Sequence, residues 1–528
     1  MPTVKQLFVW VSAFSLLVIY LLSLAWPGVL WAYVFVLPIV LLGIYDIIQK
    51  SHTILRLYPV IGHFRYLFES IRPEIQQYFV EDNINGSPVN REFRSLIYAR
   101  AKGMRDTRPF GTQFDVYRVG YEWLNHSLAP KKAKKQACRI RFGGSDCLQP
   151  YEAAIFNISA MSYGALSQHA IRALNKGAKI GGFFHNTGEG GLSPHHLQEN
   201  GDLVWQIGTG YFSCRTSDGD FNPDLFAKNA CHPNVKMIEI KLSQGAKPGH
   251  GGILPAAKVT PEIAKIRNVK IGEDVESPPG HSAFSSPVEL LEFVKQLRNL
   301  SKGKPIGFKL SLGKPEEFIA ICKAMIKTGI KPDFITVDGG EGGTGAAPIE
   351  FTNSVGTPLR EAVNIVNSIL IGFDLKDQIR LIASGKAFSA FHVFRLLALG
   401  ADTVNSARGM MFALGCIQSR NCNTNKCPTG IATQDPSRYK ALNIDLKGAR
   451  VASYQEQLIK NLAEMTAAIG LSSPSEIQAK DLNRRVSATE VKTYAEIFPS
   501  LKKGCLLNES TVPSHWTKSW SLAEPSHW

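Results

Sequence analysis

The stretch AAIFNISAMSYGALSQHAIRALNKGAKI, residues 153–180, contains the pattern that decides the fold. It opens on a short, mostly apolar run at 153–158, which predicts a buried strand. It closes on SQHAIRALNKGAKI at 167–180, where apolar residues recur with the spacing of an amphipathic helix. A polar, glycine-containing segment separates the two. Strand, polar turn and helix form the unit from which parallel sheets with crossover helices are built.

The same unit recurs as far as residue 407. Further apolar runs that predict strands lie at 182–186, 203–208, 235–242, 305–312, 333–338, 379–384 and 402–407. Helical patterns separate most of these runs, for example PEEFIAICKAMIKTG at 315–329. Eight strands alternating with helices predict a (β/α)8 TIM barrel rather than an open sheet.

The N-terminal 50 residues have a different character. No Asp, Glu, Lys or Arg occurs between Gln6 and Tyr45, and the runs 7–26 and 29–48 are each long and apolar enough to cross a bilayer. The doubled run favours two transmembrane helices over a cleaved signal peptide. Lys5 precedes the first run and Lys50 follows the second, so the positive-inside rule predicts an inner (cytoplasmic) membrane protein whose catalytic domain faces the cytoplasm.

We therefore expect four parts. They are a transmembrane hairpin at 1–50, a basic and mostly helical connecting region at 51–150, the barrel with a cysteine segment at 151–470, and a C-terminal extension at 471–528. Between residues 51 and 150 there are 16 Lys or Arg and 9 Asp or Glu, including KKAKK at 131–135. Contact with anionic lipid and a solvated face both explain this charge, and no nucleic-acid motif accompanies it.

The chain contains nine cysteines, of which three are clustered in GCIQSRNCNTNKCPTGIATQ at 415–434. The six scattered ones predict free thiols in a reducing compartment: Cys138, Cys147, Cys214, Cys231, Cys322 and Cys505. Chance, zinc and an iron–sulfur cluster are the alternatives for the three. Zinc sites usually bring CxxC pairs and a fourth ligand, and the nearest histidine, His392, is far away in sequence. Three thiolates followed by a proline favour an iron–sulfur cluster with one cysteine for each of three irons.

Polar, glycine-rich segments follow most of the predicted strands, where barrel active sites lie. After the last two strands these segments predict a phosphate site made by Ser384, Gly385, Lys386, Ala407, Arg408 and Gly409, although glycines there also suit tight turns. Lys309 lies within a predicted strand. It either pairs with an anionic group, such as a reduced flavin ring, or extends to the rim of the barrel.

Several of these segments together resemble a known family. MSYGALS, NTGEGG, QGAKPG, GGTGA and GC(x5)C(x4)CPTGIATQ, spread in this order over about residues 150–470, resemble the flavin-binding synthase domain of glutamate synthases. The resemblance implies a (β/α)8 barrel, FMN and a 3Fe-4S cluster. It also implies an oxidoreductase that converts 2-oxoglutarate and ammonia into L-glutamate through 2-iminoglutarate.

The resemblance also assigns expected roles to individual residues. The cluster ligands are Cys416, Cys422 and Cys427. Lys247 and Arg267 match positions that bind the carboxylates of the oxo acid, and Glu189 matches an acidic segment near the place where ammonia meets the substrate. The expected FMN contacts are Met161, Ser162, Gln244, Lys309, Gly340, Gly385, Lys386, Arg408 and Gly409.

The sequence departs from the family pattern in places that concern the substrate. GEGGQLP of the family is GHGGILP here, so His250 replaces an acid and Ile253 replaces a glutamine that helps to hold the oxo acid. Loss of a hydrogen-bonding side chain at a carboxylate site redirects or weakens binding. The identity of the oxo acid therefore stays open.

Other parts of the family enzymes have no counterpart in this sequence. There is no N-terminal cysteine nucleophile, no C-terminal β-helix and no GxGxxG after a strand. We expect a separate electron donor, with ammonia either free or supplied by a separate glutaminase. Two alternatives remain: flavin chemistry on another amino or oxo acid, and a membrane electron-transfer subunit without turnover. The presence of Glu189, Lys247 and Arg267 favours an enzyme.

Overall fold

The computed structural model describes residues 2–133 and 139–528. Lys134 and Lys135 of the basic run and Cys138 lie outside the described residues. The chain forms two compact units, Met1–Arg91 and Glu92–Trp528. The four-part division made from the sequence stays a prediction.

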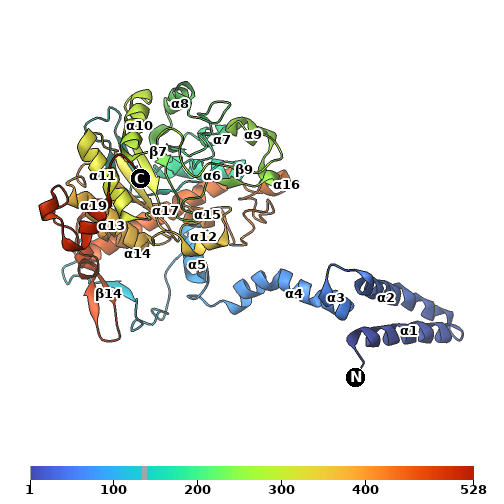
Figure 1. The fold of residues 1–528 in the computed structure, drawn as a ribbon. Coiled ribbons are helices and arrows are strands. Elements are labelled where there is room, and N and C mark those ends of the chain that lie inside the picture. The colour runs from blue at the N-terminus through green and yellow to red at the C-terminus, as the bar shows by residue number, and fades with distance from the viewer. Residues whose placement is uncertain (1, 134–138) are drawn as a thin grey trace. The chain divides into compact units, whose positions relative to one another are not determined.

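The N-terminal unit is helical and is drawn in blue in Figure 1. Its elements are α1 (Val4–Ser23), η1 (Pro27–Ala32), α2 (Tyr33–Ile48), α3 (Thr53–Leu57), α4 (Gly62–Ile75) and the π-helical turn η2 (Gln76–Val80). Val4–Ser23 and Pro27–Ile48 are long and apolar enough to cross a membrane, and most of their side chains are exposed. The two apolar N-terminal helices predicted from the sequence are thus present.

The second unit contains a closed barrel of eight parallel strands, which confirms the predicted fold class. The strands follow one another round the barrel as β4 (Phe156–Ile158), β5 (His185–Asn186), β6 (Leu203–Ile207), β7 (Val235–Lys241), β10 (Ile306–Leu310), β11 (Phe334–Asp338), β12 (Arg380–Ser384) and β13 (Thr403–Ser406). The pairing of Val404 with Phe156 closes the ring.

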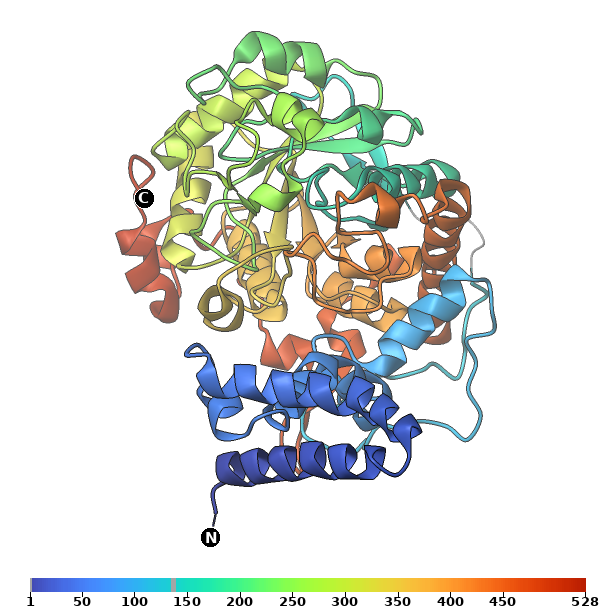
Figure 2. The ribbon, with the colours of Figure 1, turned by 90° about the vertical axis from the view of Figure 1, so that its right-hand side faces the viewer.

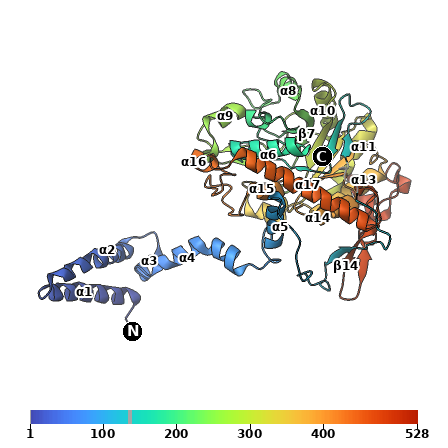
Figure 3. The ribbon, with the colours of Figure 1, turned by 180° about the vertical axis from the view of Figure 1, so that it is seen from behind.

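Helices surround the strands (Figure 2), and α17 runs beside α6 on the outside of the barrel (Figure 3). They are α5 (Arg91–Ala101), α6 (Gln168–Gly181), α7 (Pro194–Leu197), α8 (Pro223–Ala230), α9 (Pro261–Arg267), α10 (Pro287–Leu300), α11 (Pro315–Thr328), α12 (Ile349–Ser354), α13 (Leu359–Gly372), α14 (Ala390–Ala398), α15 (Arg408–Leu414), α16 (Pro436–Tyr439) and α17 (Ile444–Ala468). Side-chain caps such as Ser167 begin several of them, because the cap oxygen satisfies a free N–H of the first turn.

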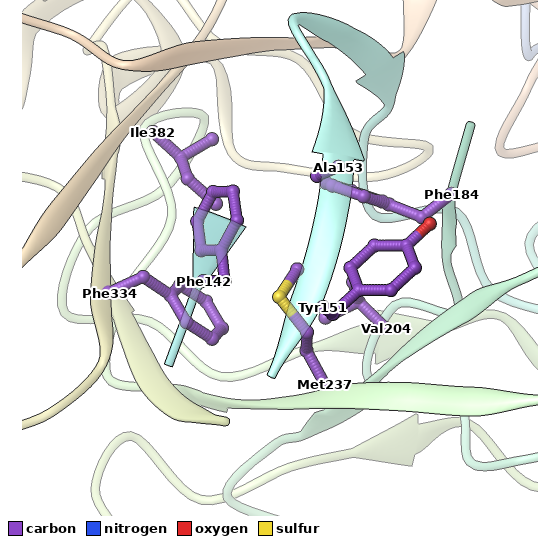
Figure 4. Packing of buried hydrophobic residues seen from close by; sticks show 8 residues of the cluster. All are labelled: Phe142, Tyr151, Ala153, Phe184, Val204, Met237, Phe334 and Ile382. Carbon is purple, nitrogen blue, oxygen red and sulfur yellow. The ribbon is translucent and has the colours of Figure 1, made fainter. Parts of the chain in front are cut away.

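A hairpin closes the N-terminal end of the barrel. Strands β2 (Arg139–Phe142) and β3 (Tyr151–Ala154) pair antiparallel. Phe142 and Tyr151 pack against barrel residues that include Phe334 and Met237, as Figure 4 shows. Packed side chains fill this end, so a site for ligands has to lie at the opposite end, where the strands terminate.

The remaining elements extend the barrel. Strand β14 (Leu482–Arg485) pairs with β1 (Glu122–Leu124) and β15 (Val491–Thr493). The buried Glu122 accepts hydrogen bonds from Arg360 at 2.6 Å and Arg395 at 2.8 Å, and so attaches this sheet to α13 and α14. The other short elements are β8 (Ile253–Leu254), η3 (Ala256–Lys258), β9 (Val275–Glu276), η4 (Pro474–Glu476), η5 (Ala479–Asp481), α18 (Tyr494–Ile497), η6 (Glu509–Thr511) and α19 (Ser514–Leu522).

Candidate functional site

A cluster of buried charges lies beyond the C-terminal ends of β5, β6 and β7. Lys241 is the last residue of β7, and its Nζ lies 2.8 Å from Oε1 of Glu189. Lys247 and Arg267 also act electrostatically on Glu189. The structure therefore brings together Glu189, Lys247 and Arg267, the three residues that the sequence analysis named for the substrate, and it adds Lys241. We call these four residues the carboxylate pocket.

The carboxylate pocket has an excess of positive charge, because three cations share one carboxylate. Burial lowers the pKa of Lys247 to about 8 and that of Arg267 to about 10. For Glu189, burial would raise the pKa, but the neighbouring cations, Lys241 first, hold it below its usual value. Glu189 is thus ionised at neutral pH. Buried cations in excess of their partners are costly, and an anionic ligand removes that cost.

Unsatisfied donors point to the same conclusion. Lys247 is 1% exposed, and its Nζ has no hydrogen-bond partner. Two further buried donor atoms, Nε of Arg267 and Nε2 of Gln244, also have no hydrogen-bond partner. One guanidinium nitrogen of Arg267, Nη2, donates to Tyr163 O at 3.0 Å. Buried polar groups are nearly always paired in folded proteins, so these donors await a ligand or water.

Glycines of the recognised segments make room for this cluster. A Cβ on Gly252 would lie 2.5 Å from Oε1 of Glu189, and one on Gly190 would lie 2.7 Å from Nη2 of Arg267. The glycines of NTGEGG and GHGG are therefore required by the close approach of charged side chains, and not only by tight turns.

Lys309 and Asp338 form a second buried pair next to the first. Lys309 Nζ lies 3.3 Å from Oδ2 of Asp338, and the same oxygen accepts a hydrogen bond from Gly245 N at 2.8 Å. Lys309 is the penultimate residue of β10 and Asp338 is the last residue of β11, so both side chains lie near the C-terminal end of the barrel strands. Neither sequence alternative for Lys309 named Asp338 as its partner.

A third group of charges lies after β12 and β13. Burial lowers the pKa of both Lys386 and Arg408, and the charge of Arg408 lowers the pKa of Lys386 further. The carboxylate of Glu341 opposes both shifts. Nη2 of Arg408 donates to Glu341 O at 2.9 Å. Two neighbouring buried cations favour an anion between them, even with Glu341 nearby, so this group fits a phosphate.

The other expected cofactor residues lie around these charges. Gly340, Gly385 and Gly409 are close to backbone or side-chain atoms of their neighbours: a Cβ would lie 2.6 Å from Gly356 O, from Leu359 Cδ2 and from Ser406 Oγ, respectively. Met161 is buried and its N donates to Asn186 O at 3.2 Å, while Ser162 is partly exposed beside it. These residues line the loops that follow β4, β11, β12 and β13.

The three clustered cysteines follow α15 in one loop, residues 415–434, which we call the cysteine loop. Burial raises the pKa of Cys416 to about 12, and the charges of Cys422 and Cys427 add to this effect. Burial also raises the pKa of Cys422, with Cys427 as the next cause. The thiols are therefore within electrostatic reach of one another.

Cys427 differs from the other two. Burial would raise its pKa, but hydrogen bonds from the Thr429 hydroxyl and from the N–H groups of Ala432, Thr429 and Ile431 lower it. A site that stabilises one thiolate and crowds two more thiols beside it has the donor set of an iron–sulfur cluster. Over residues 2–133 and 139–528, no group of three or more His, Cys, Asp or Glu side chains converges as it would to hold a single metal ion.

The two departures from the family pattern lie next to the carboxylate pocket. Ile253 is half-buried in β8, opposite Glu276 of β9, and Glu276 acts electrostatically on Lys247. His250 donates from Nδ1 to Gly251 O at 3.0 Å, and its ring lies 5.5 Å from that of Phe351. Residues 248–254 thus cover the carboxylate pocket with the apolar side chain of Ile253 and with His250, whose ring is hydrogen-bonded to the carbonyl of the next residue.

Lys241, Lys258 and Asp338 are among the buried charged residues that were not singled out from the sequence. Each stands at a strand end or in a short turn, where a charged residue also suits a solvated rim. The signal that could have found Lys241 and Asp338 is their place as the final residue of an otherwise apolar strand, since such residues line the mouth of a barrel.

Comparisons with known proteins identify the family of this chain. The profile of a family described as the conserved region in glutamate synthase matches residues 133–472. The glutamate synthase large subunit-like protein YerD of Bacillus subtilis (strain 168) is 39% identical over 482 residues, which cover 83% of this chain and 91% of that protein. The archaeal glutamate synthase (NADPH) of Methanocaldococcus jannaschii is 34% identical over 376 residues, 71% of this chain and 69% of that protein.

A solved structure was also compared. The recombinant flavin-binding domain of baker's yeast flavocytochrome b2 aligns with a TM-score of 0.42 and 14% identity, covering 83% of this chain and 92% of that one.

Proposed function

The chain belongs to the glutamate synthase family, and from this premise we propose that it is an FMN- and 3Fe-4S-dependent enzyme that converts 2-oxoglutarate and ammonia into L-glutamate. That it is a glutamate synthase-like oxidoreductase follows from the family. The observation that carries the finer proposal is the carboxylate pocket, in which three buried cations share one carboxylate and Lys247 Nζ and Arg267 Nε have no partner.

The excess cations suit an oxo dicarboxylate. Lys247 and Arg267 can bind its carboxylates, because Glu189, the carboxylate that acts on both of them, is held by Lys241 at 2.8 Å. Glu189 stays ionised and can accept hydrogen bonds from ammonia or ammonium next to the 2-oxo carbon. Condensation releases water and gives 2-iminoglutarate, and two electrons and two protons then complete glutamate.

The residues after β12 and β13 fit an FMN phosphate. Lys386 and Arg408 would hold it, since two mutually repelling cations gain most from a dianion. Lys309, beside Asp338, would contact the flavin, and so would Met161, Ser162, Gln244 and Gly340. When bound, the flavin supplies the hydride that the imine carbon receives.

The cysteine loop would hold the cluster. Cys427 is partly prepared as a thiolate by its hydrogen bonds, and Cys416 and Cys422 become thiolates on binding iron. The cluster supplies one-electron transfer between a separate donor and the flavin site. We propose that ammonia is free or comes from a separate glutaminase.

A substrate screen tests this proposal. Protein purified without air and reduced with dithionite is mixed with ammonium and, separately, with 2-oxoglutarate, oxaloacetate and pyruvate, and flavin reoxidation is followed by absorbance. We expect 2-oxoglutarate to react fastest, by about tenfold or more over pyruvate, because its two carboxylates can bind both Lys247 and Arg267. A colourless, iron-free protein would overturn the proposal.

A second candidate is flavin chemistry on a different oxo or amino acid. It is favoured by Ile253, an apolar side chain opposite Glu276 where the family has a glutamine, and by His250, whose ring is hydrogen-bonded to Gly251 O. In the same screen, fastest reoxidation by another oxo acid would support this candidate over 2-oxoglutarate.

Binding of the oxo acid should depend on pH. Burial lowers the pKa of Lys247 to about 8, so its positive charge is present below pH 8 and is lost as the pH rises through that value. Above pH 8 the neutral form of Lys247 predominates. We therefore expect the KM for the oxo acid to rise there by about tenfold for each pH unit. In the Lys247→Arg variant the guanidinium stays charged, and the KM should be independent of pH between 7 and 9.5. An equal rise in both proteins would assign the effect to another group.

The two apolar N-terminal helices support a further proposal, that they anchor the enzyme in the inner membrane with the catalytic domain in the cytoplasm. Both helices are exposed along most of their length, which a membrane accommodates and water does not. Lys5 and Lys50 flank the pair on the side that the positive-inside rule assigns to the cytoplasm.

Alkaline extraction of membranes tests the anchor. The full chain should stay in the pellet after carbonate treatment. A variant with Leu17→Arg and Leu41→Arg should be released, because both side chains are more than half exposed and a charge in a span is costly. Release of the unsubstituted chain, or recovery of a shortened N-terminus, would instead indicate peripheral attachment or a cleaved signal sequence.

A further inference from the structure

A buried lysine that the proposed function does not use lies between the carboxylate pocket and the cysteine loop. Lys258 is the last residue of η3 and is 2% exposed. Its Nζ donates to Ala165 O at 2.8 Å. Among the described residues it has no ion pair with an Asp or Glu, so its charge is not neutralised by any acidic side chain there. A lysine buried in this way is costly unless its charge serves another group.

Three hydrogen bonds from the cysteine loop fix the surroundings of Lys258. Asn425, which lies between Cys422 and Cys427, donates from Nδ2 to Ala257 O at 2.9 Å, the residue next to Lys258. Gln434 donates from Nε2 to Gly164 O at 3.0 Å and to Leu166 O at 2.9 Å, on either side of the acceptor Ala165. The lysine backbone and the carbonyl that orients its ammonium are thus both attached to the loop that carries the cysteines.

The ammonium also faces the cysteines electrostatically. Burial lowers the pKa of Lys258 to about 8, and Cys422 and Cys427 are the charges that oppose this shift. The charge that this lysine brings into the interior therefore acts on the site of the cysteines, to which its surroundings are hydrogen-bonded.

Resting on the proposed function, we propose that Lys258 is a positioning residue that raises the reduction potential of the cluster bound by Cys416, Cys422 and Cys427. Reduction adds one electron to the cluster site, and no bond forms or breaks. A fixed positive charge nearby stabilises the reduced state more than the oxidised state. Removing it makes the potential more negative.

Potentiometric titration of the full-length holoprotein, with dithionite as reductant and the cluster followed by EPR, tests this inference. Three variants separate the charge from the hydrogen bond: Lys258→Gln removes the charge and keeps a donor for Ala165 O, Lys258→Met removes both, and Lys258→Arg keeps the charge. Lys314→Met is the matched control, because that lysine is 73% exposed and pairs only with Glu317 at 3.6 Å.

We expect Lys258→Gln and Lys258→Met to lower the ratio of reduced to oxidised cluster at a fixed applied potential on the order of tenfold. Lys258→Arg and Lys314→Met should stay near the unsubstituted protein. Equal potentials in Lys258→Gln and the unsubstituted protein would overturn the inference, even if Lys258→Met is shifted, because the hydrogen bond would then matter and not the charge. Absence of any cluster signal in the unsubstituted protein would instead refute the proposed function, so the two failures are distinguishable.

Discussion

Replacing Cys422 by alanine should abolish the cluster while leaving the flavin in place. Each of the three thiols is expected to bind one iron, so a cluster with two remaining protein ligands loses its attachment on one side. Donor-dependent synthase activity should fall by at least about 100-fold, since even the residues behind metal ligands are worth 10- to 100-fold. Iron content and the EPR signal of the oxidised protein measure the loss.

The scattered cysteines offer a matched control for this result. Cys231 is exposed and lies directly after α8, in a separate part of the chain from the cysteine loop. Cys231→Ala should keep full iron content and activity. Iron content in Cys422→Ala equal to that in Cys231→Ala would refute the assignment of the cluster ligands.

Replacing Lys247 by methionine should have the second large effect. Methionine keeps most of the volume of the lysine stem but removes the unpaired ammonium, and a substrate carboxylate would then be buried without its partner. Truncation of one member of a buried charge pair costs about 2–5 kcal/mol, so the KM for the oxo acid should rise at least about 30-fold. Steady-state kinetics with 2-oxoglutarate and ammonium, supplied with an artificial electron donor, give this value.

Lys314→Met again controls for the loss of a lysine, because it lies exposed at the surface. It should leave the KM unchanged. The flavin and cluster spectra of Lys247→Met should also be unchanged, since Lys247 lies in the carboxylate pocket and not beside Lys386 or the cysteines. A KM for Lys247→Met within about threefold of the unsubstituted protein would mean that the oxo acid binds elsewhere.

The barrel itself was predictable from the sequence because its strands are buried on both faces. Such strands are short continuous apolar runs, and the helices between them keep a clear 3.6-residue spacing. The eight runs fall on the eight barrel strands, and the two charge-free runs at the N-terminus fall on Val4–Ser23 and Pro27–Ile48. The hairpin of β2 and β3 at the base was not predicted, since its two short strands have mixed, partly charged sequences.

The site was predictable only where a segment could be recognised. Glu189, Lys247 and Arg267 were named through the family resemblance, and the structure brings them together. Lys241 was missed although it ends an apolar strand, and Lys258 was missed because nothing in its local sequence separates a buried lysine from one that extends to solvent. Their burial depends on contacts distant in sequence: Glu189 for Lys241, and Ala165 with the cysteine loop for Lys258.

A single-turnover reaction with isotopically labelled ammonium tests the central claim most directly. Full-length protein reduced without air is mixed with 2-oxoglutarate and nitrogen-15 ammonium, flavin reoxidation is recorded, and the products are identified by mass spectrometry. The account predicts labelled glutamate in an amount equal to the flavin reoxidised. Flavin that stays reduced in the presence of both substrates, or that is reoxidised without forming labelled glutamate, would contradict it.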